Sequence, residues 1–175
     1  MAKIIFTHRP FQLRRPISWA NGLTRTKTKN FTDHVCWTMD DGEITNDSVV
    51  YESVVGDGVH VITYGEWIDG RIGTILFVYE IPEHIIDMDV FFIFLKSGTK
   101  YDTIALVWLL FGRNDKLKKN ATTRQFCSEL VANVMAKWMI ANGFSDYQNP
   151  FWISPGKIQM DLESIGHHPK ILTIS

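Results

Sequence analysis

The segment from residue 32 to residue 64 constrains the fold most, because strand-like runs alternate there with strong turn signals. The runs are rich in β-branched and aromatic residues, which favour extended backbone. Asp41-Gly42 and Gly56-Asp57-Gly58 lie between the runs, and pairs of this kind are typical of tight hairpin turns. The segment therefore predicts antiparallel strands over 32–39, 48–55 and 59–64.

Short apolar runs outside this segment extend the predicted sheet. They are far too short to span a bilayer, and their length suits strands. Additional strands are expected over 3–6, 73–81 and 90–95, with a further edge strand over 170–174.

Helix signals surround these strands. Helices are expected over 14–23, 103–111 and 123–142, with a helical turn or two at 82–88. The chain is therefore predicted to be α+β, with an antiparallel β-sheet of five or six strands packed against helices. Its 175 residues suit a single domain spanning 1–175.

The predicted helix over 123–142 is the longest, and apolar residues recur on one of its faces at helical spacing. Thr122 and Gln125 have the spacing of a capping box, and Asn142-Gly143 supplies a stop signal. The residues of the apolar face are Cys127, Leu130, Val131, Val134 and Trp138.

The net charge of −1 gives the chain no general attraction to nucleic acid or membranes. Basic residues gather over 9–29 and 113–124, which are either solvated loops or a rim that attracts an anionic substrate. No nucleic-acid partner, transmembrane segment or signal peptide is predicted. Only two cysteines occur, so a reducing compartment is expected, with a cytoplasmic or virion-associated location.

Cys127 allows two interpretations. By periodicity it lies on the buried helix face, where cysteine usually packs as a small apolar side chain. It also lies near the start of the longest helix, where the helix dipole favours a thiolate. A thiolate nucleophile would need a histidine base and a third group that orients this base.

Glu52 favours the second interpretation. Its neighbours on the same strand face are Val50 and Val54, and an ionised carboxylate on an apolar face is costly unless it is paired. The hairpin over 32–55 brings Glu52 close to His34 on the adjacent strand. A strand histidine is often only a hydrogen-bonded core residue, but here Cys127, His34 and Glu52 could act as nucleophile, base and orienting acid.

A metal site is an alternative, because His34 and Cys36 are close in sequence and Cys127 could join them. The chain lacks the paired short-spacing motifs typical of zinc sites. No metal and no cofactor are therefore predicted.

Segments covering most of the chain resemble the circularly permuted branch of the papain-like fold, which contains NlpC-type peptidases and relatives of lecithin:retinol acyltransferase. In this branch the histidine precedes the cysteine. The most specific match is the Cys-Ser-Glu-Leu-Val motif at 127–131, with His34 upstream by 127 − 34 = 93 residues. The matching segments are RRPISWANGLTRTKTKNFTDHVCW (14–37), VVYESVVGDGVHV (49–61), YDTIALVWLLFG (101–112), FCSELVANVMAKW (126–138) and WISPGKIQMDL (152–162).

The resemblance implies a thiol-dependent hydrolase: a cysteine peptidase, an amidase or an acyl-transfer enzyme. Cys127 would be the nucleophile, His34 the base and Glu52 the polar third residue, acting through a thioester. Backbone N–H groups at the helix start would hold the oxyanion, with Tyr101 and Gln125 as candidate side-chain donors. The substrate would be a peptide, an amide or an acyl ester, and the basic segments favour an anionic one.

The chain departs from the family pattern after the histidine, where a small residue or glycine is common and Val35-Cys36-Trp37 stands instead. Cys36 is either inert packing or a second thiol near the site. His60 competes with Glu52 for the orienting role. A non-catalytic structural or interaction protein that keeps this fold, for example in a virion, is the alternative function.

Overall fold

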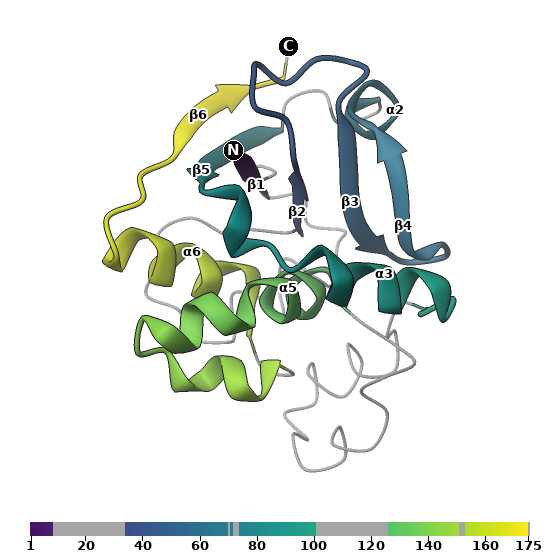
Figure 1. Ribbon diagram of the computed structural model, residues 1–175. Coiled ribbons are helices and arrows are strands. Elements are labelled where there is room, and N and C mark those ends of the chain that lie inside the picture. Colours follow the sequence, from purple (N-terminus) through teal and green to yellow (C-terminus); the bar gives the residue numbers. More distant parts are fainter. Residues whose placement is uncertain (9–33, 70, 72–73, 101–125, 151–152, 175) are drawn as a thin grey trace, which may run out of the picture.

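The computed structural model describes residues 1–8, 34–69, 71, 74–100, 126–150 and 153–174, and Figure 1 shows their arrangement. The fold is α+β, as predicted, with one six-stranded sheet packed against helices. The strand order is β4-β3-β2-β1-β5-β6, and every neighbouring pair is antiparallel.

Six of the predicted strands are confirmed, including the edge strand near the C-terminal end, which pairs with β5. The central strands β1, β2 and β5 are buried along almost their whole length, because apolar clusters cover both faces of the sheet. The strands are β1 (Ala2–His8), β2 (His34–Thr38), β3 (Val49–Val54), β4 (Gly58–Thr63), β5 (Ile75–Ile81) and β6 (Lys170–Thr173).

The described helices lie mainly on one side of the sheet, where α3, α5 and α6 gather (Figure 1). The predicted helices over 14–23 and 103–111 lie outside the described residues. No helix in the described ranges combines the length and the apolar character needed to cross a bilayer. The helices are α2 (Tyr64–Ile68), η1 (Glu83–Ile85), α3 (Met88–Lys96), α5 (Cys127–Ala141), η3 (Ser145–Gln148) and α6 (Pro155–Ser164).

The strand predicted over 90–95 is wrong, because this apolar run forms most of α3. The side chain of Asp87 accepts a hydrogen bond from the backbone N–H of Val90 at 3.3 Å and so caps the helix. Phe91 is buried, whereas the neighbouring Phe92 and Ile93 are exposed. The run therefore belongs to a helix with one buried face. From the sequence alone, an apolar run this short fits a helix as well as a strand.

The tight turn predicted at Asp41-Gly42 is also wrong, because residues 39–48 form a longer loop between β2 and β3. The Nζ atom of Lys3, a buried residue of β1, donates to the carbonyl oxygens of Asp40 and Gly42, at 2.5 Å each. These contacts hold the loop against β1, so the chain does not turn tightly from β2 into β3 at Asp41-Gly42. The turn at Gly56-Asp57-Gly58 is confirmed between β3 and β4.

The long helix begins at Cys127, so the capping box predicted at Thr122 and Gln125 does not mark its start. Phe126 is the N-cap residue, and its backbone N–H donates to the side chain of Glu129 at 2.9 Å. The helix ends at the predicted stop, where Gly143 has a φ of 93°.

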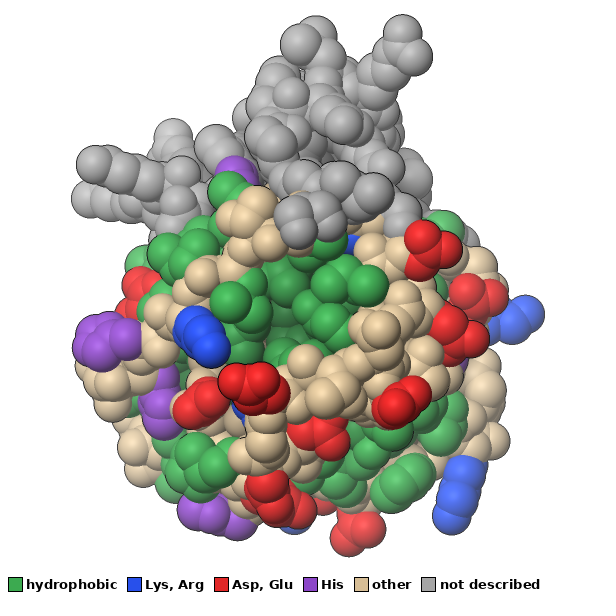
Figure 2. All heavy atoms as spheres, turned by 90° about the horizontal axis from the view of Figure 1, so that it is seen from above, with side chains coloured by type: hydrophobic (Ala, Val, Ile, Leu, Met, Phe, Trp, Pro, Cys, Tyr) green, Lys and Arg blue, Asp and Glu red, His purple; other side chains and the backbone are tan. Residues whose placement is uncertain are grey.

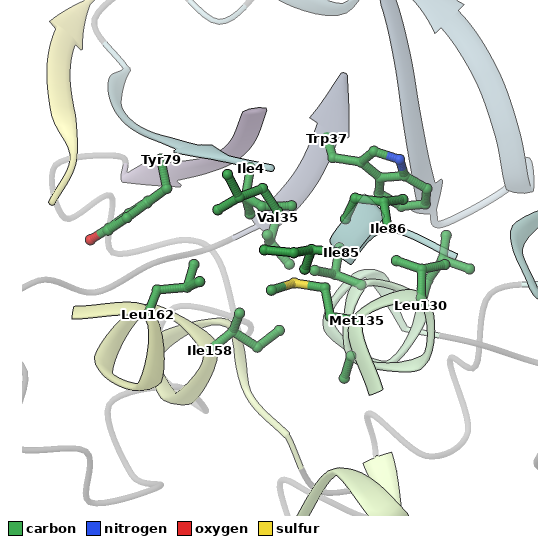
Figure 3. Packing of buried hydrophobic residues seen from close by; sticks show 14 of the residues in the cluster. Ile4, Val35, Trp37, Tyr79, Ile85, Ile86, Leu130, Met135, Ile158 and Leu162 are labelled. Atoms are coloured by element: carbon green, nitrogen blue, oxygen red, sulfur yellow. The ribbon is translucent and has the colours of Figure 1, made fainter. Parts of the chain in front are cut away.

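Apolar side chains cover both faces of the sheet. One cluster lies between the sheet and the helices α5 and α6, and Figure 3 shows its side chains pointing toward one another. Residues next to these along the strands, such as Ile5 and Cys36, belong to a second cluster on the other face. The larger cluster includes Ile4, Val35, Trp37, Leu130, Met135, Ile158 and Leu162.

The end of the molecule that carries the β2–β3 loop is hollowed. Figure 2 views this end from above and shows hydrophobic side chains gathered in the hollow, with acidic side chains along part of its rim. His34 is the first residue of β2, whereas this loop follows the last one. The hollow and His34 therefore belong to opposite ends of that strand.

Candidate active site

His34 and Glu52 form a short hydrogen-bonded pair on adjacent strands. The Nε2 atom of His34 lies 2.6 Å from Oε2 of Glu52. In the β2–β3 register Trp37 is opposite Tyr51, so continuing the pairing by one residue puts Cys36 opposite Glu52. His34 is then the diagonal neighbour of Glu52 on the same face. The partner predicted for Glu52 is confirmed.

Cys127 joins this pair from the helix side. It is the first residue of α5, which packs across β2 and β3, and it is 5% exposed. Its thiol lies near enough to the ring of His34 for its charge and hydrogen bonding to raise the pKa of that ring. Because Nε2 of that ring faces Glu52, Nδ1 is the nitrogen left for the thiol. The fold therefore brings the three predicted residues together in the order thiol, imidazole, carboxylate.

The surroundings favour the charged forms of both members of the histidine–acid pair. Burial lowers the pKa of His34, but the negative charge of Cys127 and hydrogen bonds to Cys127 and Glu52 outweigh it and raise the pKa to about 9. Burial raises the pKa of Glu52, yet the hydrogen bond and charge of His34, with help from Trp67 and Arg71, bring it below its ordinary value. The histidine ring is therefore an imidazolium at neutral pH, next to a carboxylate.

His60 contacts Glu52 as well. It is the direct cross-strand partner of Glu52 on β4, and its Nε2 lies 3.4 Å from Oε1 of the carboxylate. The other ring nitrogen, Nδ1, lies 3.3 Å from the carbonyl oxygen of Gly58. Glu52 thus lies between two histidines. The residue in short contact with His34 is Glu52, through Oε2. His60 contacts the other oxygen of Glu52, Oε1.

Trp67 and Arg71 are parts of the site that the sequence did not reveal. The indole Nε1 of Trp67 donates to Oε2 of Glu52 at 2.9 Å. The guanidinium of Arg71 lies over the indole ring, 4.3 Å from its centroid. One signal was available: Thr63 and Glu66 have capping-box spacing and start a helix directly after β4, which places a tryptophan next to the strand pair.

Cys36 behaves differently from Cys127. It is fully buried, and its Sγ lies 3.8 Å from the carbonyl oxygen of Ile5. Burial, and then the negative charge of Glu52, raise the pKa of its thiol well above the ordinary value. These features favour inert packing for Cys36. Among the described residues, no group of three or more His, Cys, Asp or Glu side chains is arranged to hold a metal ion.

The start of α5 supplies further polar groups beside Cys127. The backbone N–H groups in the first turn of a helix have no acceptor within the helix and carry the positive end of its dipole. The carboxylate of Glu129, which is itself buried, receives the N–H of Phe126 and fixes the peptide just before the thiol. Tyr101 and Gln125, the predicted side-chain donors, lie outside the described residues.

The chemistry of this site is therefore defined by side chains from three elements. A thiol at a helix start contacts an imidazole at a strand start, and the imidazole contacts a carboxylate on the next strand. The two basic segments, 9–29 and 113–124, for which the sequence allows either solvated loops or an anion-attracting rim, lie wholly outside the described residues. Comparison of the chain with protein-family models, curated proteins and solved structures found no match.

Proposed function

We propose that this protein is a thiol-dependent hydrolase of the permuted papain-like, NlpC-type kind, acting on an amide, ester or thioester bond. The observation that carries the proposal is the position of His34, whose ring contacts the thiol of Cys127 on one side and Glu52 at 2.6 Å on the other. This is the arrangement of a nucleophile, its base and the group that orients the base.

The chain order of these groups supports the family assignment. The histidine comes first, on a strand, the acid follows on the adjacent strand, and the cysteine comes last, at the start of a helix that packs on both strands. The six-stranded antiparallel sheet, with most of the described helices on one face, has the α+β character that the resemblance implies.

In the reaction, the thiolate of Cys127 attacks the acyl carbon, and the carbonyl electrons move onto the oxygen. Backbone N–H groups at the start of α5, including that of Cys127, stabilise this oxyanion. The imidazolium of His34 gives its proton to the leaving amine or alcohol, and a thioester remains on Cys127.

The second half of the cycle reverses these roles. The neutral ring of His34 takes a proton from water, the resulting hydroxide attacks the thioester, and the thiolate leaves as the acid is released. Glu52 keeps Nε2 in its donor role throughout and stabilises the imidazolium form. An acceptor other than water would give acyl transfer by the same steps.

Pulse labelling with iodoacetamide tests the proposal with the chain as its own control. From about pH 5 to about pH 8, Cys127 should react at least on the order of tenfold faster than Cys36, because only Cys127 has an imidazolium partner. The variant His34→Ala should slow labelling of Cys127 and leave Cys36 unchanged. Peptide mapping of the labelled protein separates the two thiols.

Slow and equal labelling of both thiols, unaffected by His34→Ala, would contradict a catalytic arrangement and favour a structural role. If Cys127 is reactive, amide, ester and thioester probes offered to the wild type and to Cys127→Ala identify the bond class. Probe turnover that persists in Cys127→Ala would exclude this thiol as the nucleophile.

A further inference from the structure

We propose that Trp67 is a positioning residue for Glu52, and that its indole N–H keeps this buried acid ionised and correctly turned toward His34. The inference rests on the proposed function, because it assigns a role within the same site. It concerns a residue outside the three predicted groups.

The geometry at one carboxylate oxygen carries the proposal. Oε2 of Glu52 accepts from Nε2 of His34 at 2.6 Å and from Nε1 of Trp67 at 2.9 Å. Two donors on one oxygen fix the rotation of the carboxylate about its last side-chain bond, which is otherwise a broad, weakly restrained torsion. The other oxygen, Oε1, faces His60 at the longer distance of 3.4 Å.

Trp67 is itself held from several sides. It is fully buried in the cluster on the face of the sheet away from α5, and its ring stacks on Tyr64 with a centroid distance of 5.6 Å. The short helix α2 is capped at Thr63, whose Oγ1 accepts from the N–H of Glu66 at 3.3 Å. Arg71 lies over the indole and donates to the backbone carbonyl of Trp67. The donor is therefore preorganised.

The charge balance around Glu52 explains why a neutral donor matters. The titratable and charged groups that act on this carboxylate are His34 and Cys36 from β2, His60 from β4 and Arg71 beyond α2. The charge of a histidine ring depends on its protonation, whereas an indole N–H is a neutral donor at every pH of interest. Trp67 thus stabilises the carboxylate independently of the state of either histidine.

Trp67→Phe tests the proposal, because phenylalanine keeps a buried ring but has no N–H. Without this donor the carboxylate protonates more readily, so the acid limb of the pH profile for Cys127 labelling should move up by about one pH unit. Trp37→Phe is the matched control: Trp37 is also fully buried, but its Nε1 has no hydrogen-bond partner among the described residues. That variant should leave the acid limb in place.

A second measurement reads the contact without relying on reactivity or on the folding of Trp67→Phe. In a ¹⁵N-labelled protein near neutral pH, Glu52→Gln replaces a charged acceptor by a neutral one. The indole N–H resonance of Trp67 should then move upfield, and that of Trp37 should not. Slow labelling of Cys127 in the wild type would contradict the proposed function. The indole resonance would still report whether the N–H of Trp67 donates to Glu52.

The proposal is overturned if Trp67→Phe moves the acid limb no further than Trp37→Phe does. It is also overturned if Glu52→Gln leaves both indole resonances unchanged. Either result would make Trp67 a packing residue of the second cluster.

Discussion

At the scale of single residues, Glu52 is the most informative position in the chain. Its side chain is 3% exposed on a strand whose other residues on that face are valines, yet it remains a carboxylate. Donors from three elements, His34, His60 and Trp67, surround it. A buried acid with this many partners is costly to assemble for packing alone, which is why it indicates a chemical role.

The variant Glu52→Gln should slow labelling of Cys127 on the order of tenfold to a hundredfold at neutral pH. The amide retains the shape of the acid but cannot stabilise the imidazolium of His34 by charge. The rate of iodoacetamide labelling measures the effect, and circular dichroism checks that the fold is kept. Glu80→Gln, which changes an exposed acid on β5, is the control and should have no effect. An unfolded Glu52→Gln protein with an unchanged rate per folded molecule would make Glu52 structural.

The triad candidates could be found from the sequence because each leaves a local signal. Glu52 interrupts a valine face, His34 lies on the preceding strand, and Cys127 occurs in a specific motif at a helix start. Trp67 leaves no such signal, because a buried tryptophan is ordinary in a core rich in aromatic residues. Its role can be inferred only from the tertiary structure, which shows that its indole N–H donates to Glu52.

At the scale of elements, the sequence predicted the sheet better than the boundaries within it. Strand-like runs bounded by turn residues identified β2, β3 and β4, short apolar runs identified β1, β5 and β6, and helical spacing identified α5. The apolar run of α3 was assigned to a strand because it carries no periodicity, and only Asp87 at its start indicates a helix. The loop after β2 could not be predicted, since its shape depends on the distant Lys3.

The turn between β3 and β4 sets the register that pairs Glu52 with His60, and its two glycines differ in their surroundings. Gly56 and Gly58 both have positive φ angles, 103° and 75°. A Cβ atom on Gly56 would enter open space, whereas one on Gly58 would collide with the carbonyl oxygen of Thr99. That oxygen also accepts the N–H of Val59 at 2.9 Å, so it cannot move away freely.

We therefore expect Gly56→Ala to lower the free energy of unfolding by about 1 kcal/mol, the cost of the backbone conformation. Gly58→Ala should lower it by roughly 2 to 4 kcal/mol, because the same cost is joined by a steric clash with backbone. Urea denaturation of both variants measures the difference. Equal losses would show that the contact with Thr99 does not constrain the turn.

At the scale of the whole molecule, the candidate site lies at the end of the sheet where β2 begins, and groups from both faces of the sheet contribute to it. His34 and Glu52 belong to the face shared with Trp67, whereas Cys127 belongs to the cluster between the sheet and the helices. The histidine at the first position of β2 reaches the thiol because both residues begin their elements. The stability of the fold and the geometry of the site are therefore linked through β2, β3 and α5.

This linkage gives the protein an expected response to acid. The folded pKa of Glu52 is lowered, so its ionised form contributes stability above the pKa of an unfolded glutamate. That contribution is lost as the pH falls through the folded value. The free energy of unfolding of the wild type should therefore drop more steeply on acidification than that of Glu52→Gln. Glu80→Gln should follow the wild type, and parallel curves for all three proteins would contradict the linkage.

The sequence by itself determined the fold class, the antiparallel strands and the three residues of the candidate site. These depend on local signals: runs of β-branched, aromatic and other apolar residues, turn residues, helical spacing and a carboxylate on an apolar face. Tertiary structure decided what depends on neighbours distant in the chain. It decided that the apolar run at 90–95 is helical and that the loop after β2 is bound by Lys3. It also decided that Trp67 and His60 contact Glu52. Partners of buried polar groups are set by packing across strands, and no local pattern specifies them.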